Sequence, residues 1–249
     1  MIACEAMIAW DARVFFRAAL LAALGLFIAW VITAASDEGG IGWGIRAGRS
    51  LPVAPLCGAV GTALALLPAR ARDEFRTLES LGRTPFWNGS AAASGGGLVP
   101  LAAALLVALV PAISVEGFFP ALGRGDAHYR YEGGAFVDET RGIRVEADGS
   151  FAPLAQAAAQ APIDPLPEGA RASSALVMAV AGVALPLVCA GTLARRRRAS
   201  AAVLAVSLMA GASIVLFHLA SARTVPSLVA VVPASALLLW GVLRYREPP

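Results

Sequence analysis

Six long apolar runs alternate with shorter polar segments along the chain, and this alternation is the dominant pattern of the sequence. The predicted spans occupy residues 18–36, 50–69, 90–115, 172–194, 199–222 and 224–243. Each run approaches or exceeds the roughly 20 residues that a helix needs to cross the hydrocarbon layer. Pro100 and Pro111 lie in the third run, where we expect them to kink the helix. The first run is interpreted as a span rather than a cleaved signal segment, because it is long for a signal segment and further spans follow.

The composition supports the same class of protein. The chain is 58% hydrophobic and only 15% charged, and its mean hydropathy is positive, as in integral membrane proteins. All basic residues are arginines, and the net charge of +3 is too small to indicate binding to nucleic acid. The three cysteines, Cys4, Cys57 and Cys189, lack ligand spacing and are interpreted as packing residues without a disulfide.

The positions of the arginines predict the orientation of the spans. With the N-terminus inside, 12 of the 20 basic residues fall on the inner side, including the cluster 195–198 after the fourth span. Four of the others lie in the long segment after the third span, and long segments count little in the positive-inside rule. We therefore expect both termini to be cytoplasmic.

The segment between the third and fourth spans has a β pattern of its own. Its predicted strands are residues 128–131, 135–137 and 143–146, with turn signals at 133–134, 141–142 and 148–149. Residues 152–167, rich in Ala, Gln and Pro, are expected to form a loose return arm. The sequence thus predicts a small β-meander that is too small to bury much core and needs a partner.

The predicted fold class follows from these two patterns. It is an all-α polytopic membrane protein of six transmembrane helices, three before and three after a small β-rich periplasmic insertion. The predicted domains are residues 1–116 with the first three helices, 117–171 with the β domain, and 172–249 with the last three helices.

A charged segment, residues 70–84, separates the second and third spans. Phe75, Leu78 and Leu81 recur at a three-residue spacing, which predicts an apolar side on a short helix. Asp73 is a plausible N-cap and Gly82 a plausible residue after the C-cap, so the helix has about two turns. A helix this short needs a docking partner to be stable. The alternative is a solvated cytoplasmic loop, and the spacing alone does not decide between them.

The sequence argues against several kinds of chemistry. It lacks a Gly-rich phosphate loop, so the chain itself is not expected to hydrolyse ATP. His128 and His218 lie in different regions and predict no metal site, and no Ser-His-Asp arrangement can be argued. His218, inside the fifth span, is either a functional intramembrane group or hydrogen-bonded to a neighbouring helix. The spans lack acidic residues apart from Glu116 at a helix end, which argues against a proton-driven carrier. We therefore predict a protein that is not an enzyme and holds no cofactor or metal.

Several motifs together carry a resemblance to a known family. Glu74, Gly82 and Thr84 match the spacing of a coupling-helix pattern that reads Glu, a mixed apolar and basic stretch, Gly, any residue, Ser, with Thr replacing Ser. The stretch LPVAPLCGAVGTALALL before it, the arginines after the fourth span, and Pro226 and Pro233 in the last span also match. Over its membrane spans the chain resembles the LptF/LptG (YjgP/YjgQ) permeases, the membrane halves of the lipopolysaccharide-exporting ABC transporter.

The resemblance implies a bacterial inner-membrane half-transporter driven by a separate, dimeric ABC ATPase subunit. Residues 70–84 would be the coupling helix that enters a groove of the ATPase, where Glu74 would pair with a basic residue. The residues expected to couple to the ATPase are Glu74, Phe75, Arg76, Leu78, Gly82 and Thr84. Because a dimeric ATPase has two such grooves, the resemblance also implies a second six-helix permease, identical or homologous.

The implied substrate is a membrane lipid or glycolipid. Arg46 and Arg49, just before the second span, would contact its phosphates, since a guanidinium offers a bidentate donor fork. The alternative is that both arginines anchor the helix at the lipid headgroups.

The insertion is much shorter than the jellyroll of the family, so only part of that sandwich is expected here. In the family the jellyroll hands lipid to a periplasmic partner. A shortened jellyroll keeps a second hypothesis open, in which the chain transmits ATPase motion to a periplasmic partner without moving substrate, as the FtsX family does. The FtsX fold usually has four spans, which counts against this hypothesis. A membrane enzyme or secondary carrier is a third hypothesis, disfavoured by the missing acids and catalytic clusters.

Overall fold

The structure is a computed structural model, and it describes residues 2–36, 42–119, 129–132, 134–138, 143–146, 148–153, 166–194 and 199–246. Its α-helices are α1 (Ile2–Ala35), α2 (Trp43–Ser50), α3 (Ala54–Ala71), α4 (Glu74–Ser80), α5 (Pro85–Leu109), α6 (Ala170–Ala194), α7 (Ala199–Ser221) and α8 (Val232–Arg246). Short 3-10 helices are η1 (Leu51–Val53), η2 (Glu116–Phe118) and η3 (Ser227–Val231). The arginine cluster 195–198 and His128 lie outside the described residues.

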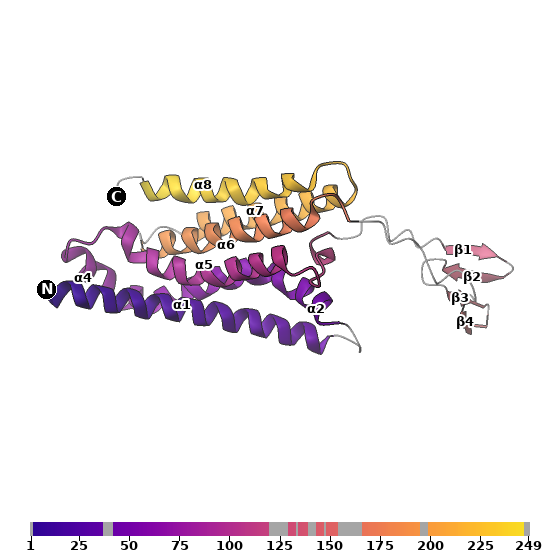
Figure 1. Cartoon of the computed structure of the whole chain (residues 1–249), viewed down its shortest axis with the longest axis horizontal. Helices are drawn as coiled ribbons and strands as arrows, with labels where there is room; N and C mark the ends of the chain where they lie inside the picture. The colour runs from indigo at the N-terminus through magenta and orange to yellow at the C-terminus, as the bar shows by residue number, and fades with distance from the viewer. Residues whose placement is uncertain are drawn as a thin grey trace.

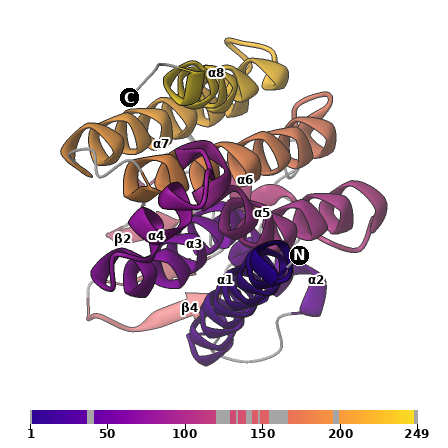
Figure 2. The ribbon, with the colours of Figure 1, turned by 90° about the vertical axis from the view of Figure 1, so that its left-hand side faces the viewer.

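Six of the described helical stretches are long and apolar enough to cross a membrane, as predicted. They are Met7–Ala35, Trp43–Ala71, Trp87–Leu109, Ala170–Ala194, Ser200–Ser221 and Ser227–Arg244. Together they define a multi-pass membrane protein. α6 contacts α3, α5 and α8, while α1 packs on α3 and α5, so α3, α5 and α6 form the middle of the bundle (Figure 2).

The two ends of the bundle carry different elements. The N-terminus, α4 and the C-terminus lie at one end, whereas α2 and the β-sheet lie at the other (Figure 1). The small residues of the core allow the helices to approach closely, as is common in membranes. A Cβ atom on Gly61 of α3, for example, would lie 2.6 Å from the carbonyl oxygen of Ala18 on α1.

Several helix boundaries differ from the predicted ones. α1 begins at Ile2 instead of residue 18, because Trp10, Val14 and Ala18 recur every four residues and are all buried on one side of the helix. α5 ends at Leu109 instead of residue 115, so Pro111 lies beyond the helix. Finally, residues 43–49, which precede the predicted second span, belong to the helix α2.

Two glycines of α2 let this helix lie directly on the segment that follows α5. A Cβ on Gly44 would lie 1.9 Å from the carbonyl oxygen of Ala112, and one on Gly48 would lie 2.0 Å from that of Ser114. The backbone N–H of Ser114 also donates to the carbonyl of Gly44 at 3.1 Å. The contact is therefore made between backbones and leaves no room for side chains.

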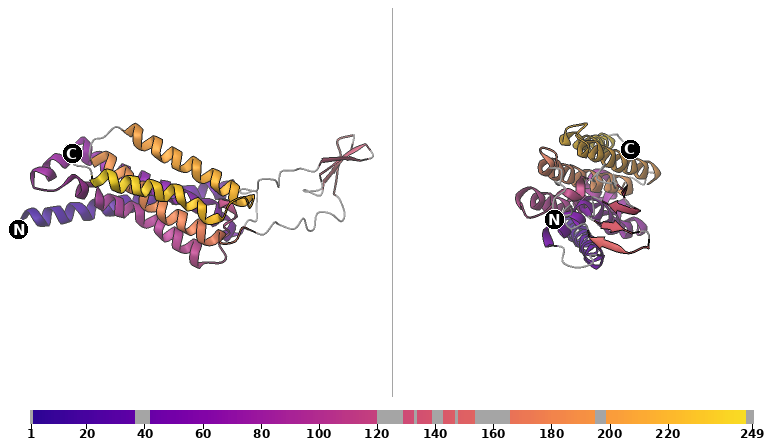
Figure 3. Two further views of the ribbon diagram at one scale, coloured as in Figure 1. Left: turned by 90° about the horizontal axis from the view of Figure 1, so that it is seen from above. Right: turned by 90° about the vertical axis from the view of Figure 1, so that its right-hand side faces the viewer.

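The described sheet is antiparallel, with the strand order β1-β2-β3-β4. Its strands are β1 (Tyr129–Glu132), β2 (Ala135–Asp138), β3 (Ile143–Val145) and β4 (Phe151–Pro153). Gly134 and Gly149 adopt the left-handed conformation in the turns, with φ of +85° and +82°. β4 overlaps the start of the predicted loose return arm, most of which lies outside the described residues, as does the predicted turn at 141–142. The sheet lies beyond the end of the helices (Figure 3).

Candidate functional site

α4 is docked onto the bundle by two apolar side chains. Phe75 is 1% exposed and Leu78 is 7% exposed. They belong to a buried cluster drawn from α1, α3, α5 and α6 that includes Trp10, Val14, Ala18, Ala65, Leu66, Ala69, Ala92 and Ala190. The rings of Trp10 and Phe75 meet edge to face, with 6.4 Å between their centroids. The segment is thus an ordered helix against the bundle and not a solvated loop.

The C-terminus of α4 explains why glycine stands at position 82. Gly82 has a φ of +86°, a conformation that glycine adopts without steric cost. Its N–H donates to the carbonyl of Glu79 at 2.9 Å, and the N–H of Arg83 donates to that of Leu78 at 3.1 Å. These two bonds form a Schellman motif. The predicted position of Leu81 is wrong, because Leu81 is the C-cap and remains 52% exposed where the chain leaves the helix.

The N-terminus of α4 is less regular. Asp73 occupies the N-cap position with a φ of 59°, but its side chain makes no capping hydrogen bond. Its carboxylate instead lies 3.3 Å from the guanidinium of Arg76, in a pair whose side chains are both half or more exposed. An exposed pair of this kind contributes little to stability.

Glu74 is bound within the chain through both carboxylate oxygens. The indole N–H of Trp10 donates to Oε2 at 3.0 Å, and Arg72 donates to Oε1 at 3.3 Å. The Trp10 bond joins α4 to α1 across the end of the bundle. The side chain of Arg72 is 66% exposed, so its bond is the more replaceable of the two.

Arg83 makes a second connection to α1, which the sequence did not predict. Its guanidinium pairs with the carboxylate of Asp11 at 2.5 Å and donates to the carbonyl of Trp87 at 2.6 Å. It also lies 5.2 Å from the centroid of the Trp10 ring, within cation–π range. A third connection runs to α5, where Asn88 donates to Glu79 at 3.2 Å.

The predicted coupling residues therefore divide into two groups. Phe75 and Leu78 are buried and Glu74 is partly buried, so these three hold α4 to its own bundle. The other predicted residues, Arg76, Gly82 and Thr84, are exposed, as are Thr77, Ser80 and Leu81. α4 thus has one side fixed to three helices and one side facing away from them.

The two predicted phosphate-contacting residues lie on α2, at the opposite end of the bundle. Arg46 is half-buried, with its guanidinium carbon 6.0 Å from the centroid of the Trp30 ring. Arg49 is exposed one turn further along. Both precede η1, whose Pro52 lines an apolar cavity.

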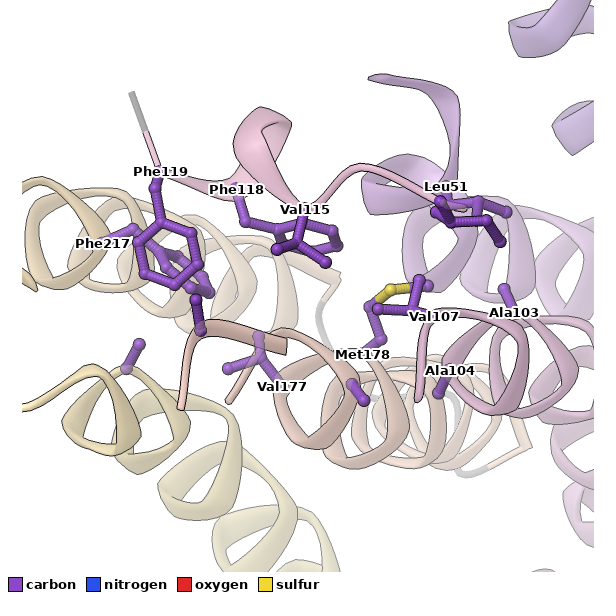
Figure 4. Close-up of a cluster of buried hydrophobic side chains, with 14 of the residues drawn as sticks. Leu51, Ala103, Ala104, Val107, Val115, Phe118, Phe119, Val177, Met178 and Phe217 are labelled. Carbon is purple, nitrogen blue, oxygen red and sulfur yellow. The ribbon is translucent and has the colours of Figure 1, made fainter. Parts of the chain in front are cut away.

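That cavity has a volume of about 310 Å³ and lies between α3, α6 and α7. Its lining is mostly apolar and includes Leu56, Met178, Met209 and Phe217. Phe118 also lines it, and its ring centroid lies 5.9 Å from that of Phe217 (Figure 4). A second cavity of about 270 Å³ continues along the same three helices and shares Leu185 with the first. The two neighbouring cavities are together called the α3–α6–α7 groove.

His218 lines the first cavity. Its Nδ1 lies 2.8 Å from the carbonyl oxygen of Ile214, one turn earlier on the same helix. Of the two alternatives for His218, the hydrogen bond to a neighbouring helix is not found at Nδ1, whose bond lies within α7. Among the described residues no group of three His, Cys, Asp or Glu side chains is placed to hold a metal ion.

Arg171, in the first turn of α6, closes the end of α5. Its guanidinium donates to the carbonyls of Val107 and Val110 at 2.7 and 2.9 Å. It also donates to Pro111 and Ile113 at 3.0 and 2.9 Å. One cation thus satisfies the carbonyl of Val107, which the helix end leaves without an intrahelical partner, and binds three carbonyls of the segment that follows it. The sequence carried no motif for this contact, because its partners are backbone atoms some 60 residues away in the chain.

Comparison with protein-family models, curated proteins and solved structures finds no match to this chain.

Proposed function

We propose that the chain is the membrane half-transporter, or permease, of an ABC-type lipid exporter that resembles the lipopolysaccharide export system. A separate dimeric ATPase subunit drives it. The observation that carries the proposal is α4, a short helix outside the spans that is fixed to the bundle on one side and exposed on the other. In this function α4, the N-terminus and the C-terminus face the cytoplasm of a bacterium, and the sheet is periplasmic.

The contacts of α4 provide a route for motion. A force on α4 reaches α3 and α5 through the buried Phe75 and Leu78, because packed side chains transmit displacement. It reaches α1 through the Trp10–Glu74 bond and the Asp11–Arg83 pair. Three spans would therefore move with α4 when the ATPase closes.

Glu74 retains its proposed role as the partner of a basic residue in the ATPase groove. That residue would take the place of Arg72 at Oε1, since the Arg72 side chain is mostly exposed. Trp10 would keep its bond to Oε2, so that the same carboxylate joins the ATPase to α1. Arg76, Gly82 and Thr84 would line the rest of the contact.

The groove between α3, α6 and α7 suits a lipid chain. Its lining is apolar, and its two cavities follow the length of the helices. A lipid whose chains lie there would have its headgroup near α2, where Arg46 and Arg49 would meet its phosphates. α1 and α7 are the spans least covered by the rest of the chain, since only 11% of the most apolar stretch of each is buried. A second six-helix permease, identical or homologous, would cover them and complete the pathway.

One observation favours the second hypothesis, in which motion passes to a periplasmic partner without transport. The sheet is small and presents exposed aromatic side chains, including Phe136 and Phe151. Lipid that co-purifies in the α3–α6–α7 groove would favour the transporter over this alternative.

The proposal is tested by purifying the tagged chain from its own membranes in mild detergent and identifying proteins and lipids by mass spectrometry. We expect an ABC ATPase subunit and a membrane lipid. The double variant Arg76→Glu, Leu81→Asp changes only exposed residues of the α4 segment and should lose the ATPase. Glu116→Arg, an equally exposed change at the opposite end, should retain it. Absence of any ATPase with the unaltered chain would overturn the proposal.

Transport itself is tested with Glu74→Ala. The complex should assemble, or be slightly weakened, because Phe75 and Leu78 still dock α4. ATP-driven lipid release from proteoliposomes should be lost, because the carboxylate of Glu74 makes both the proposed ion pair with the ATPase and the bond to Trp10 of α1. Unchanged release would remove Glu74 from the mechanism.

A further inference from the structure

A further cavity lies beyond the last turn of α7, at the end of the bundle that carries α2 (Figure 1). Its volume is about 870 Å³, within the range of small-molecule sites. One wall is formed by residues 166–169, which precede α6, and the other by residue 220 and residues 223–228, which join α7 to η3. None of the described residues that line it also lines the α3–α6–α7 groove. The cavity is therefore separate from that groove.

Hydrogen bonds hold the two walls of this cavity together. The hydroxyl of Ser227 donates to the backbone carbonyl of Glu168 at 2.7 Å, although the two residues lie 59 positions apart in the chain. Ser227 is buried at the start of η3. The hydroxyl of Thr224 donates to the carbonyl of Leu219 at 2.8 Å, which fixes the other wall to the end of α7. The shape of the cavity thus belongs to the fold.

Arg223, in the wall after α7, has a backbone conformation that is unusual for arginine. The N–H of Thr224 donates to the carbonyl of Leu219, and the N–H of Arg223 to that of Ala220, both at 3.0 Å. These two bonds form a Schellman motif in which Arg223 takes the place usual for glycine, with a φ of 57°. The same motif at the end of α4 has Gly82 there. A residue with a Cβ pays a steric cost in this conformation, and such strain tends to be kept where the side chain has a function.

Arg223 also lies at the level of the membrane surface. One span ends at Ser221 and the next begins at Ser227, so the link between them is short and follows the membrane boundary. Lipid phosphates lie at this level, and a guanidinium binds a phosphate through two parallel hydrogen bonds. An arginine that only anchors a helix at the headgroups needs neither a cavity nor a left-handed backbone. Arg223 has both, which favours a defined phosphate site.

Glu168 adds the opposite charge to the same cavity. It is exposed and lies in the wall before α6, across from the segment that carries Arg223. A carboxylate only accepts hydrogen bonds, so it is complementary to a cationic donor. A ligand that satisfies both charged residues carries a phosphate and an ammonium group. The ethanolamine headgroup of a phospholipid has this pair of charges.

We propose that this cavity binds the headgroup of an ethanolamine phospholipid, with the phosphate on Arg223 and the ammonium group on Glu168. The apolar part of the lipid would lie against Val225 and Leu228, which also line the cavity. Leu228 is 55% exposed, so it is open to a lipid chain. The proposal requires only that the helices cross a membrane. It goes beyond the proposed function and does not depend on the ATPase.

The test is photo-crosslinking of the full chain in nanodiscs of phosphatidylcholine, whose choline group has no N–H donor. A trace of phosphatidylethanolamine carries a diazirine on its acyl chain close to the glycerol, and peptide mass spectrometry locates the attachment. Unlabelled phosphatidylethanolamine, phosphatidylglycerol and inorganic phosphate are the competitors. Phosphatidylglycerol has the phosphate but no cation, and inorganic phosphate distinguishes a lipid site from a site for a free anion.

The variants separate binding from folding. Arg223→Gly removes the guanidinium and relieves the left-handed strain, so attachment should fall several-fold while the unfolding midpoint does not decrease. Arg223→Asn, which also tolerates this conformation, repeats the test in case Arg223→Gly does not fold. Glu168→Gln should keep the attachment but reduce the preference for phosphatidylethanolamine. Arg13→Gln removes an exposed arginine at the opposite end and should change neither property.

We expect the label on residues 220–228 and several-fold stronger competition by phosphatidylethanolamine than by phosphatidylglycerol. Labelling that does not concentrate there, equal competition by the two lipids, or displacement by inorganic phosphate as effective as by lipid would each overturn the proposal. Full labelling of both Arg223 variants would do the same. So would a lower unfolding midpoint of both, because Arg223 would then serve the fold. The assay contains no ATPase and measures no transport, so its failure leaves the proposed function standing.

Discussion

At the α4 end of the bundle the elements are joined through side chains, whereas at the α2 end several of the joining contacts are made to backbone atoms. α4 is held by Phe75 and Leu78 in an apolar cluster and by the Trp10–Glu74 bond. α2 instead lies with Gly48 directly on the backbone of the segment after α5. In the same region Arg171 binds four carbonyl oxygens. The two ends therefore differ in what a partner could change.

Side-chain contacts can be exchanged for contacts with a partner, because a rotamer change releases them. Backbone contacts at glycine cannot be exchanged without moving whole elements. This difference suits the proposed function, in which force enters at α4 and the α2 end acts as the fixed point. The comparison can be tested with variants that remove single contacts at each end. Variants at the α2 end are expected to lower the free energy of unfolding more than variants at the α4 end.

The largest loss is expected for Arg171→Met. Three partly buried carbonyls and one exposed carbonyl lose a charged donor, and we expect a loss of about 3 kcal/mol in the free energy of unfolding. Arg171→Lys keeps the charge but not the planar fork, so its free energy of unfolding should lie between those of Arg171→Met and the unaltered chain. The measurement is the unfolding midpoint in mixtures of dodecyl sulfate and mild detergent. Equal stability of Arg171→Met and the unaltered chain would show that the hydrogen bonds of Arg171 to the four carbonyls do not stabilise the fold.

The next effect is expected for Gly48→Ala. The new Cβ would lie 2.0 Å from the carbonyl oxygen of Ser114, so α2 must shift, at a cost of about 2 kcal/mol. Gly211→Ala is the matched control, because this helical glycine of α7 has no atom within 4 Å of its added Cβ. It should be neutral or slightly stabilising, since alanine favours helix. The same unfolding assay compares the two, and similar losses would refute the close contact of α2.

Much of the fold could be predicted because its signals are local. The six spans follow from runs of apolar residues, and the spacing of Phe75 and Leu78 indicates the buried side of α4. Gly82 was identified as the residue after the helix because only one position offered glycine there. The prediction for Leu81 was wrong because α4 ends at Ser80. Leu81 is the C-cap, so the three-residue spacing no longer places its side chain on the buried side.

The remaining features depend on contacts between distant parts of the chain. The four-residue spacing of Gly44 and Gly48 could have suggested a packing helix, but not that it lies on residues 112–117. Arg83 and Asp11 lie 72 residues apart, and nothing local marks them as a pair. The sheet also depends on the register of four strands, and β4 was not recognised as a strand.

A smaller effect is expected at the α4 end for Arg83→Met. The variant loses the ion pair with Asp11, whose side chain is 37% exposed, so solvent already weakens the pair. The Nη1 atom of Arg83 also lacks a hydrogen-bond partner among the described residues, which reduces what the native contact contributes. We expect a loss of about 1 kcal/mol in the unfolding assay. A loss as large as that of Arg171→Met would remove the difference between the two ends.

The smallest change in stability is expected for Trp10→Phe. This variant separates the contribution of Trp10 to stability from its proposed part in passing ATPase motion to α1. Phenylalanine keeps an aromatic ring against Phe75 and beneath Arg83 but cannot donate to Glu74. One partly buried hydrogen bond is lost, at a cost of about 0.5–1 kcal/mol. In the proposed function the connection of Glu74 to α1 is lost as well, so ATP-driven lipid release should fall further than stability does. Trp43→Phe, at an exposed tryptophan of the opposite end, should change neither. If Trp10→Phe lowers stability but leaves lipid release intact, motion reaches the bundle through Phe75 and Leu78 instead.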